Sequence, residues 1–231
     1  MKPINFLKYI ECLFFPSRCK VCNKVVYIGK EICDGCNSQL RPIPENISLM
    51  LVSNPNVNVK LGFKPRYDGV IAPYYHEEGS KAMVYNLKFK GRKELVSLIG
   101  KDMSKAYNEY LKSKDIDCVC YVPCKFISTL KRGYNHVWLL AKYFSKASNL
   151  QLISALKLVR NKLPQHTLSR AERIENIKGA FGFIDKYEVK GKTVLLIDDI
   201  MTTGATFNEC AKVLKRAGAK RVYGLMATIN I

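Results

Sequence analysis

Several features that would assign a protein to a broad class are missing from this sequence. No apolar run reaches the roughly 18 uninterrupted residues that a membrane-spanning helix needs. The first fifteen residues are rich in apolar side chains, but Lys8 and Glu11 interrupt them and no small-residue cleavage site follows. This opening is typical of an amphipathic helix and not of a secretory signal peptide, which predicts a cytoplasmic protein without a membrane span.

Acidic residues are scarce. The chain has 19 Asp and Glu against 38 Lys and Arg, a formal charge of +19, and no acidic residue lies between Asp117 and Glu172. Such an excess of cations favours nucleic acids, acidic surfaces or polyanionic substrates as partners. Internal repeats and low-complexity segments are also absent, and 231 residues suffice for one sizeable core with a small appendage.

A P-loop is absent as well. Gly191-Lys-Thr193 is similar to the end of that motif, but Lys186 occupies the position of its first glycine. The tripeptide also precedes an apolar, strand-like run, whereas a P-loop follows one. The sequence is therefore not that of a P-loop nucleotidase.

Cysteine, by contrast, is plentiful. Two Cys-x-x-Cys pairs, Cys19 with Cys22 and Cys33 with Cys36, are separated by ten residues. Each pair places two thiolates on one side of a metal, so two pairs complete a tetrahedral four-cysteine site, for which zinc is the expected ion. A redox role would need only one pair, and a reducing cytosol disfavours disulfides. Because four protein ligands leave no open position, the zinc is expected to be structural.

The most informative stretch is residues 194–206, Val-Leu-Leu-Ile-Asp-Asp-Ile-Met-Thr-Thr-Gly-Ala-Thr. Its apolar run predicts a strand covered on both faces, as in a parallel sheet, and open α/β sheets bind ligands at the carboxyl ends of such strands. The following turn offers successive backbone N–H groups, three hydroxyls and Gly204 ahead of a predicted helix. These groups predict a phosphate cradle.

The two acids beside this cradle, Asp198 and Asp199, would repel a phosphate, but they suit hydroxyl groups or a cation. A phosphate on one side and a diol on the other indicate a ribose 5-phosphate. The alternative is an ordinary strand–helix turn whose threonines only cap the helix.

A second buried strand is expected over residues 118–122. Residues 123–134 are predicted to form a loop at its carboxyl end, facing the same crevice as the cradle. Three cations lie in this loop: Lys125, Lys131 and Arg132. Asn135 is predicted to cap the next helix, and His136 is interpreted as a cap or surface residue.

Two other segments are less distinctive. Residues 46–66 have little periodicity after the stiff Pro-Ile-Pro at 42–44, and they are interpreted as a linker, with an edge strand as an option. A basic cluster is either a solvated face or a site for an anionic partner. It comprises Lys88, Lys90, Arg92 and Lys93.

The order of acid pair, two residues and Thr-Thr-Gly-x-Thr resembles the signature of type I phosphoribosyltransferases. Other motifs are similar to those of the ComF family of competence-associated, phosphoribosyltransferase-like proteins. They are Leu13-Phe-Phe-Pro-x-x-Cys-x-x-Cys22, Leu87-Lys-Phe-Lys-Gly-Arg92, Arg132-Gly-Tyr-Asn135, and Gln165-x-x-Leu-Ser-x-x-x-Arg173-x-x-Asn176-x-x-Gly-Ala-Phe181. The sequence departs from the family at His136, where Gln is more frequent, and at Cys124, usually an aliphatic position.

The resemblance implies an α/β fold: a mostly parallel sheet flanked by helices, with a small N-terminal four-cysteine zinc-ribbon module. The implied domains are the module at 1–45, a linker at 46–66 and a phosphoribosyltransferase-like domain at 67–231. The implied ligands are phosphoribosyl pyrophosphate and Mg²⁺, with an acceptor that the sequence does not identify. DNA uptake in natural transformation is the implied process.

The resemblance also implies roles for individual residues. Asp198 and Asp199 are the expected catalytic acids, holding the ribose hydroxyls. The 5-phosphate is expected to bind at Met201, Thr202, Thr203, Gly204, Ala205 and Thr206. Pyrophosphate is expected to bind at Pro123, Cys124, Lys125, Lys131 and Arg132. A lid loop over the site would include Gln165 and Arg173.

Two alternatives to an enzyme stay open at this point. In the first hypothesis, the chain is an accessory that binds single-stranded DNA and works with other DNA-uptake proteins. In the second, it is a sensor that binds phosphoribosyl pyrophosphate without turnover. The first alternative draws on the acid-free basic stretch between Asp117 and Glu172 and on the zinc module.

Overall fold

The computed structural model describes residues 16–53, 64–159 and 175–230. Five parallel strands form the central sheet in the order β1-β8-β7-β3-β4, and a short sixth strand, β2, continues the β1 edge beside β8. Their bounds are β1 Gly69–Ile71, β2 Tyr74–Tyr75, β3 Cys118–Tyr121, β4 Gln151–Leu152, β7 Thr193–Met201 and β8 Arg221–Ile229.

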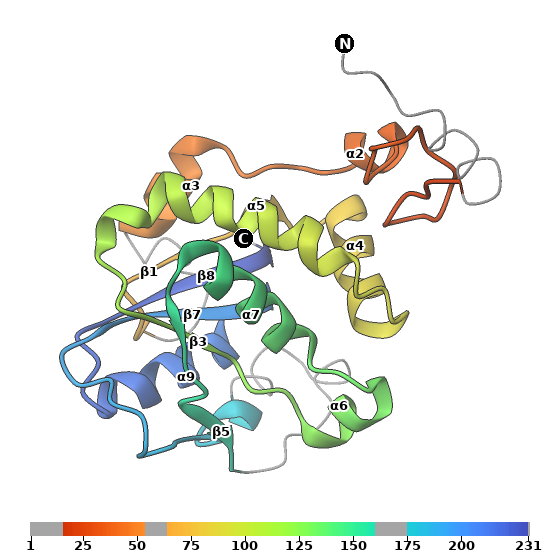
Figure 1. Ribbon diagram of the computed structural model, residues 1–231. Helices are drawn as coiled ribbons and strands as arrows, with labels where there is room; N and C mark the ends of the chain where they lie inside the picture. Colours follow the sequence, from red (N-terminus) through yellow and green to blue (C-terminus); the bar gives the residue numbers. More distant parts are fainter. Residues whose placement is uncertain (1–15, 54–63, 160–174, 231) are drawn as a thin grey trace.

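Helices cover both faces of this sheet (Figure 1). One face packs against α4 (Glu78–Phe89), α5 (Leu95–Tyr110) and α7 (His136–Ser148), and the other against α9 (Ala205–Arg216). An antiparallel pair, β5 (Leu156–Leu158) and β6 (Phe181–Phe183), lies beside α9. The layered, parallel α/β architecture predicted from the sequence is confirmed.

The central strand β7 contains the most informative stretch of the sequence. Val194 and Leu196 face the core under α9, whereas Leu195 and Ile197 face the core under α4, α5 and α7. All four are fully buried because neighbouring strands and helices surround β7 on every side. The strand continues through both acids as far as Met201, four residues beyond Ile197, the last residue of its apolar run.

The segment after β3 differs from its prediction. In place of an irregular loop over 123–134, residues Phe126–Arg132 form helix α6. No glycine or proline interrupts the chain between Pro123 and Gly133, and Gly133, at a φ of 73°, ends the helix in the left-handed conformation. The prediction failed because loop character was inferred from position after a strand and not from local helix propensity.

The segment interpreted as a linker begins with a helix, α3 (Glu45–Ser53). Ile47 and Leu51, one turn apart, both contact the core, and Leu51 is fully buried. The first part of 46–66 is therefore packed structure, although the domain boundaries themselves remain a prediction. The expected N-terminal amphipathic helix and the lid residues Gln165 and Arg173 lie outside the described residues.

Within the parts of the chain that the structure describes, no helix combines the length and hydropathy needed to cross a membrane.

Candidate functional site

The candidate phosphate site is the junction between β7 and α9. After Met201 the chain turns through Thr202 and Thr203 to Gly204, which is the N-cap of α9 at a φ of 71°. This left-handed conformation favours glycine, and the absence of a side chain at Gly204 lets an anion approach the backbone of the turn, where the N–H of Ala205 donates to Thr203 Oγ1 at 3.4 Å. No acidic residue lies in the first turn of α9, so the positive end of the helix dipole is not neutralised locally.

Asp199 is buried at the carboxyl end of β7 and has three hydrogen-bond partners. Its Oδ2 accepts from Lys88 Nζ at 3.0 Å and from His136 Nε2 at 2.9 Å, and its Oδ1 accepts from the backbone N–H of Ile200. Burial opposes ionisation of this carboxyl, but the Lys88 charge and the His136 hydrogen bond outweigh burial and hold the pKa of Asp199 far below its usual range. Asp199 is therefore an ionised, compensated carboxylate.

Asp198 is equally buried but has no cation bonded to it among the described residues. Its Oδ1 accepts the backbone N–H of Asp199. Burial, followed by the negative charge of Asp199, raises the pKa of Asp198 well above the usual value. Two adjacent carboxyl groups thus have opposite environments, a pattern that favours one protonated and one ionised acid.

His136 is a site residue that the sequence interpretation missed. Its side chain is buried at the start of α7, and Arg132 Nη1 lies 3.3 Å from His136 Nδ1. Arginine can only donate, so Nδ1 is assigned as the acceptor and Nε2 as the donor to Asp199. The expectation of a cap or surface role is wrong, because Asn135 caps the helix and His136 turns inward to the acid.

Lys88 is the second missed partner. It lies in the last turn of α4. Burial is the largest single effect and lowers its pKa, but the charge and the hydrogen bond of Asp199, together with the charge of Asp198, outweigh burial, so the net shift is upward. The sequence signal was available in the basic cluster over residues 88–93. Sequence alone did not show that one cation of this cluster reaches the buried acid, 111 residues away along the chain.

The residues expected to bind pyrophosphate divide into two groups. Cys124, in the turn after β3, lies beside the acid pair. Burial and the charges of Asp199 and Asp198 raise the pKa of its thiol to about 12, and the charges of Lys88 and Arg132 oppose this shift. Arg132 is also connected to the acid pair, because it contacts His136, which is hydrogen-bonded to Asp199. Lys131 is exposed, and nothing in the described residues joins it to the acids.

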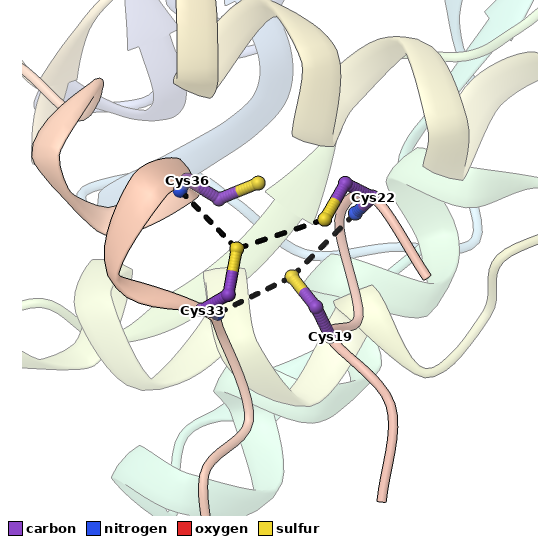
Figure 2. A group of neighbouring side chains, drawn as sticks. All are labelled: Cys19, Cys22, Cys33 and Cys36. Atoms are coloured by element: carbon purple, nitrogen blue, oxygen red, sulfur yellow. Dashed lines mark hydrogen bonds between the residues drawn. The ribbon is translucent and has the colours of Figure 1, made fainter. Parts of the chain in front are cut away.

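A second candidate site comprises the four N-terminal cysteines, and Figure 2 shows their sulfur atoms converging. All four Sγ atoms of Cys19, Cys22, Cys33 and Cys36 lie within 4.8 Å of one another. A tetrahedral zinc ion with Zn–S bonds near 2.3 Å would set the sulfur separations at about 3.8 Å, so the cluster fits zinc after a small contraction.

Local hydrogen bonds support this assignment. The Sγ of Cys19 accepts backbone N–H groups from Val21, Cys22 and Cys33. Burial alone would raise the pKa of Cys19, but these bonds lower it to about 6, which favours the thiolate that a metal requires. The four-cysteine cluster predicted from the sequence is confirmed.

Comparisons with known proteins agree with this architecture. Residues 151–226, which include β7 and the turn into α9, match the phosphoribosyl transferase domain family. Competence protein F of Haemophilus influenzae is 26% identical over 224 residues, covering 92% of this chain and 97% of that protein. DNA utilization protein YhgH of Escherichia coli K12 is 26% identical over 208 residues, covering 88% and 86%.

Competence protein ComFC of Bacillus subtilis is 26% identical over 146 residues, which are 63% of this chain and 57% of that protein. The matched domain, the parallel sheet and the cysteine cluster lead to one assignment. The chain is a member of the ComF/ComFC family of competence proteins, with a phosphoribosyltransferase domain and an N-terminal four-cysteine cluster.

Proposed function

We propose that this protein binds phosphoribosyl pyrophosphate with Mg²⁺ at the β7–α9 junction and transfers the phosphoribosyl group to an acceptor. The observation that carries the proposal is an acid pair, of which Asp199 is compensated by Lys88, beside a glycine turn at the carboxyl edge of a parallel sheet. The matched domain family supports it, since a phosphoribosyltransferase domain implies a ligand of this kind.

The 5-phosphate would be held by the backbone N–H groups of residues 202–206. Gly204 lets the phosphate approach the backbone, and the N-terminus of α9 supplies partial positive charge. The hydroxyls of Thr202, Thr203 and Thr206 are further donors within the same turn. These groups would offer several donors to the anionic oxygens.

The ribose hydroxyls would lie against Asp198 and Asp199. Asp199, ionised and held by Lys88 and His136, can accept from a hydroxyl, and a protonated Asp198 can donate as well as accept. Lys88 also removes the repulsion that an uncompensated acid pair would exert on a phosphorylated ligand. The compensation explains how acids and phosphates can share one site.

Pyrophosphate would lie toward the turn at 123–125 and toward Arg132. Mg²⁺ commonly takes phosphate oxygens as ligands and keeps several waters, so it would share the pyrophosphate charge with these residues. In the reaction, the acceptor attacks the anomeric carbon and loses a proton, while the bond to pyrophosphate breaks and its electron pair leaves with pyrophosphate. Carboxylates near the ribose would stabilise the cationic character that develops at this carbon.

The proposal is tested by calorimetric titration of phosphoribosyl pyrophosphate into the zinc-loaded protein with Mg²⁺, followed by a pyrophosphate-release assay over a panel of acceptors. Asp199→Asn should abolish binding, because it removes the charge that orients Lys88 and His136. Asp115→Asn is the matched control, since it makes the same isosteric change at an exposed acid that belongs to neither candidate site. Wild-type protein that binds no phosphoribosyl pyrophosphate would refute the proposal.

A second candidate function is binding of single-stranded DNA. The relatives are named for competence and DNA utilization, and this chain has a formal charge of +19. Four cations also surround a cavity of about 230 Å³ beside α9: Lys64, Arg66, Lys178 and Lys212. DNA binding through this surface predicts a steep loss of affinity with salt. The slope should become shallower in a double variant of Arg66→Ala and Lys178→Ala.

A further inference from the structure

The four-cysteine module is hydrogen-bonded to the end of α4 that contains Lys88. Asn86 Nδ2 donates to the backbone carbonyl of Val21 at 2.8 Å, and Arg92 Nη2 donates to the carbonyl of Cys19 at 3.3 Å. Both carbonyls belong to the first Cys-x-x-Cys turn. The two donors flank Lys88, one on each side along the chain.

Asn86 also organises the end of the helix through its backbone. Its carbonyl oxygen accepts from the N–H groups of Lys90 and Arg92, which closes the last turn of α4. The same residue therefore fixes the helix end internally and ties it to the cysteine module. Its side chain is partly buried in this contact.

Ion pairs hold the module against the next helix as well. Lys20, the residue between Cys19 and Val21, contacts Glu31 and donates to Ser97 Oγ, and Lys101 lies 2.6 Å from Glu31. Lys20, Glu31, Ser97 and Lys101 connect both halves of the module to α5. The module is thus anchored on α4 and α5, two helices that pack on the central sheet.

A continuous series of contacts follows from these bonds. It runs from the first pair of cysteines, through the carbonyls of Cys19 and Val21, to Asn86 in the last turn of α4 and to Arg92 just beyond it. From that last turn it continues through Lys88 to Asp199. A metal bound by the four thiolates would fix the backbone of the first Cys-x-x-Cys turn, because two of its residues would be ligands. The conformation of that turn sets the position of both carbonyls.

We propose that Asn86 and Arg92 are positioning residues through which metal occupancy of the four-cysteine site holds Lys88 on Asp199 and so controls affinity at the β7–α9 junction. This inference rests on the proposed phosphoribosyl pyrophosphate site. When the hydrogen bonds of Asn86 and Arg92 to the module are lost, the end of α4 becomes more mobile, and Lys88 spends part of the time away from Asp199. Asp199 then faces the ligand as an uncompensated negative charge, and affinity for an anionic ligand falls.

The test uses Asn86→Asp in the full-length, zinc-loaded protein. This change is isosteric, but it replaces the donor with a carboxylate that repels the Val21 carbonyl. Affinity for phosphoribosyl pyrophosphate with Mg²⁺ should fall by about 5- to 150-fold, the usual range of coupling between two sites. Asn108→Asp, an exposed substitution of the same kind on α5, should leave the affinity unchanged.

If Asn86→Asp folds poorly, two further measurements on the wild type test the proposal. Zinc removal from the wild type by a chelator should lower the affinity to a similar extent. Hydrogen exchange of the backbone over residues 84–92 should accelerate both on zinc removal and in the variant, with β7 unaffected.

The outcomes separate this inference from the proposed function. If zinc-loaded wild type binds phosphoribosyl pyrophosphate, and Asn86→Asp and the zinc-free protein bind it equally well, the inference is wrong and the proposed function stands. If the wild type binds none, the proposed function itself is wrong. Unchanged exchange over residues 84–92 after zinc removal would also overturn the inference.

Discussion

The adjacent acids of β7 should respond in opposite ways to the same isosteric change. Asp198→Asn keeps the oxygen that accepts the N–H of Asp199 and removes a buried group that is costly to ionise. Asp199→Asn removes the charge that Lys88 compensates and weakens the acceptor of the His136 hydrogen bond, leaving Lys88 partly buried without its counter-ion. We therefore expect Asp198→Asn to stabilise the ligand-free protein and Asp199→Asn to destabilise it.

The expected magnitudes follow from burial. Asp198 is 8% exposed, and removal of a buried, poorly compensated polar group is worth about 1–3 kcal/mol at neutral pH. Breaking a fully buried ion pair costs about 3–5 kcal/mol, and because the Lys88 side chain is 27% exposed, about 2–3 kcal/mol is expected for Asp199→Asn. Asp198→Asn should nevertheless weaken ligand binding, since stability and function compete at this position.

The contributions of Asp198 and Asp199 to the free energy of unfolding change with pH in opposite directions. The pKa of Asp198 is raised by folding, so its contribution to stability is fully present below the unfolded value of about 3.9 and is lost as pH rises toward the folded value. The advantage of Asp198→Asn should therefore grow above about pH 4. The pKa of Asp199 is lowered by folding, so its contribution is present above about 3.9 and is lost as pH falls below it.

The assay is urea unfolding of wild type and both variants at several values between about pH 4 and pH 7.5, a range that spans the window above the unfolded pKa. Each variant is compared with wild type at the same pH, because zinc affinity itself changes with pH. If Asp198→Asn destabilises the protein at neutral pH as much as Asp199→Asn does, the assignment of one compensated and one uncompensated acid is wrong.

Three further predictions concern neighbouring parts of the site and core. His136→Gln should keep a hydrogen bond to Asp199 and cost less than His136→Leu, for which thermal or urea unfolding should show a loss of about 1–3 kcal/mol; equal losses would contradict the hydrogen bond. Gly204→Ala should cost about 1–2 kcal/mol in unfolding and should weaken ligand binding in calorimetry, because φ is 71° and the turn must stay open; unchanged binding would contradict the cradle. Gly100→Ala should cost about 1–3 kcal/mol, because its Cβ would overlap the Tyr143 ring where α5 meets α7, and a neutral result would mean that this contact relaxes freely.

The elements with strong local signals could be predicted from the sequence. The apolar run before Asp198 favoured a buried strand, and the two Cys-x-x-Cys pairs at ten-residue separation indicated a clustered metal site. Asn135 was identified as a helix cap, and its Oδ1 does accept the N–H of Trp138. In each case, the structure is determined by residues that are close together along the chain.

The partners of Asp199 could not be predicted in this way. Lys88 and His136 reach the acid from two different helices, 111 and 63 residues away along the chain. A lone histidine at a helix start and a lysine in a basic cluster have many ordinary explanations, and only the packing of α4 and α7 on β7 selects one. The resemblance to a known family contained both positions, since Lys88 lies in the motif at 87–92 and His136 replaces a frequent glutamine. It did not assign their contact.

Helix α6 was missed for a different reason. The basic residues after β3 were assigned to a loop because ligands bind at the carboxyl ends of strands, and this expectation overrode the local sequence. Pro123 at the start and Gly133 at the end mark the bounds within which a short helix forms. The helix places Arg132 against His136, a contact that a loop assignment gave no reason to expect.

The central claim is that the β7–α9 junction binds phosphoribosyl pyrophosphate, and calorimetric titration of this ligand with Mg²⁺ into the zinc-loaded wild type tests it most directly. We predict saturable binding with one site per chain, which Asp199→Asn abolishes and the control Asp115→Asn preserves. Absence of binding to a folded, zinc-loaded wild type, or equal binding to the Asp199→Asn variant, would contradict the claim.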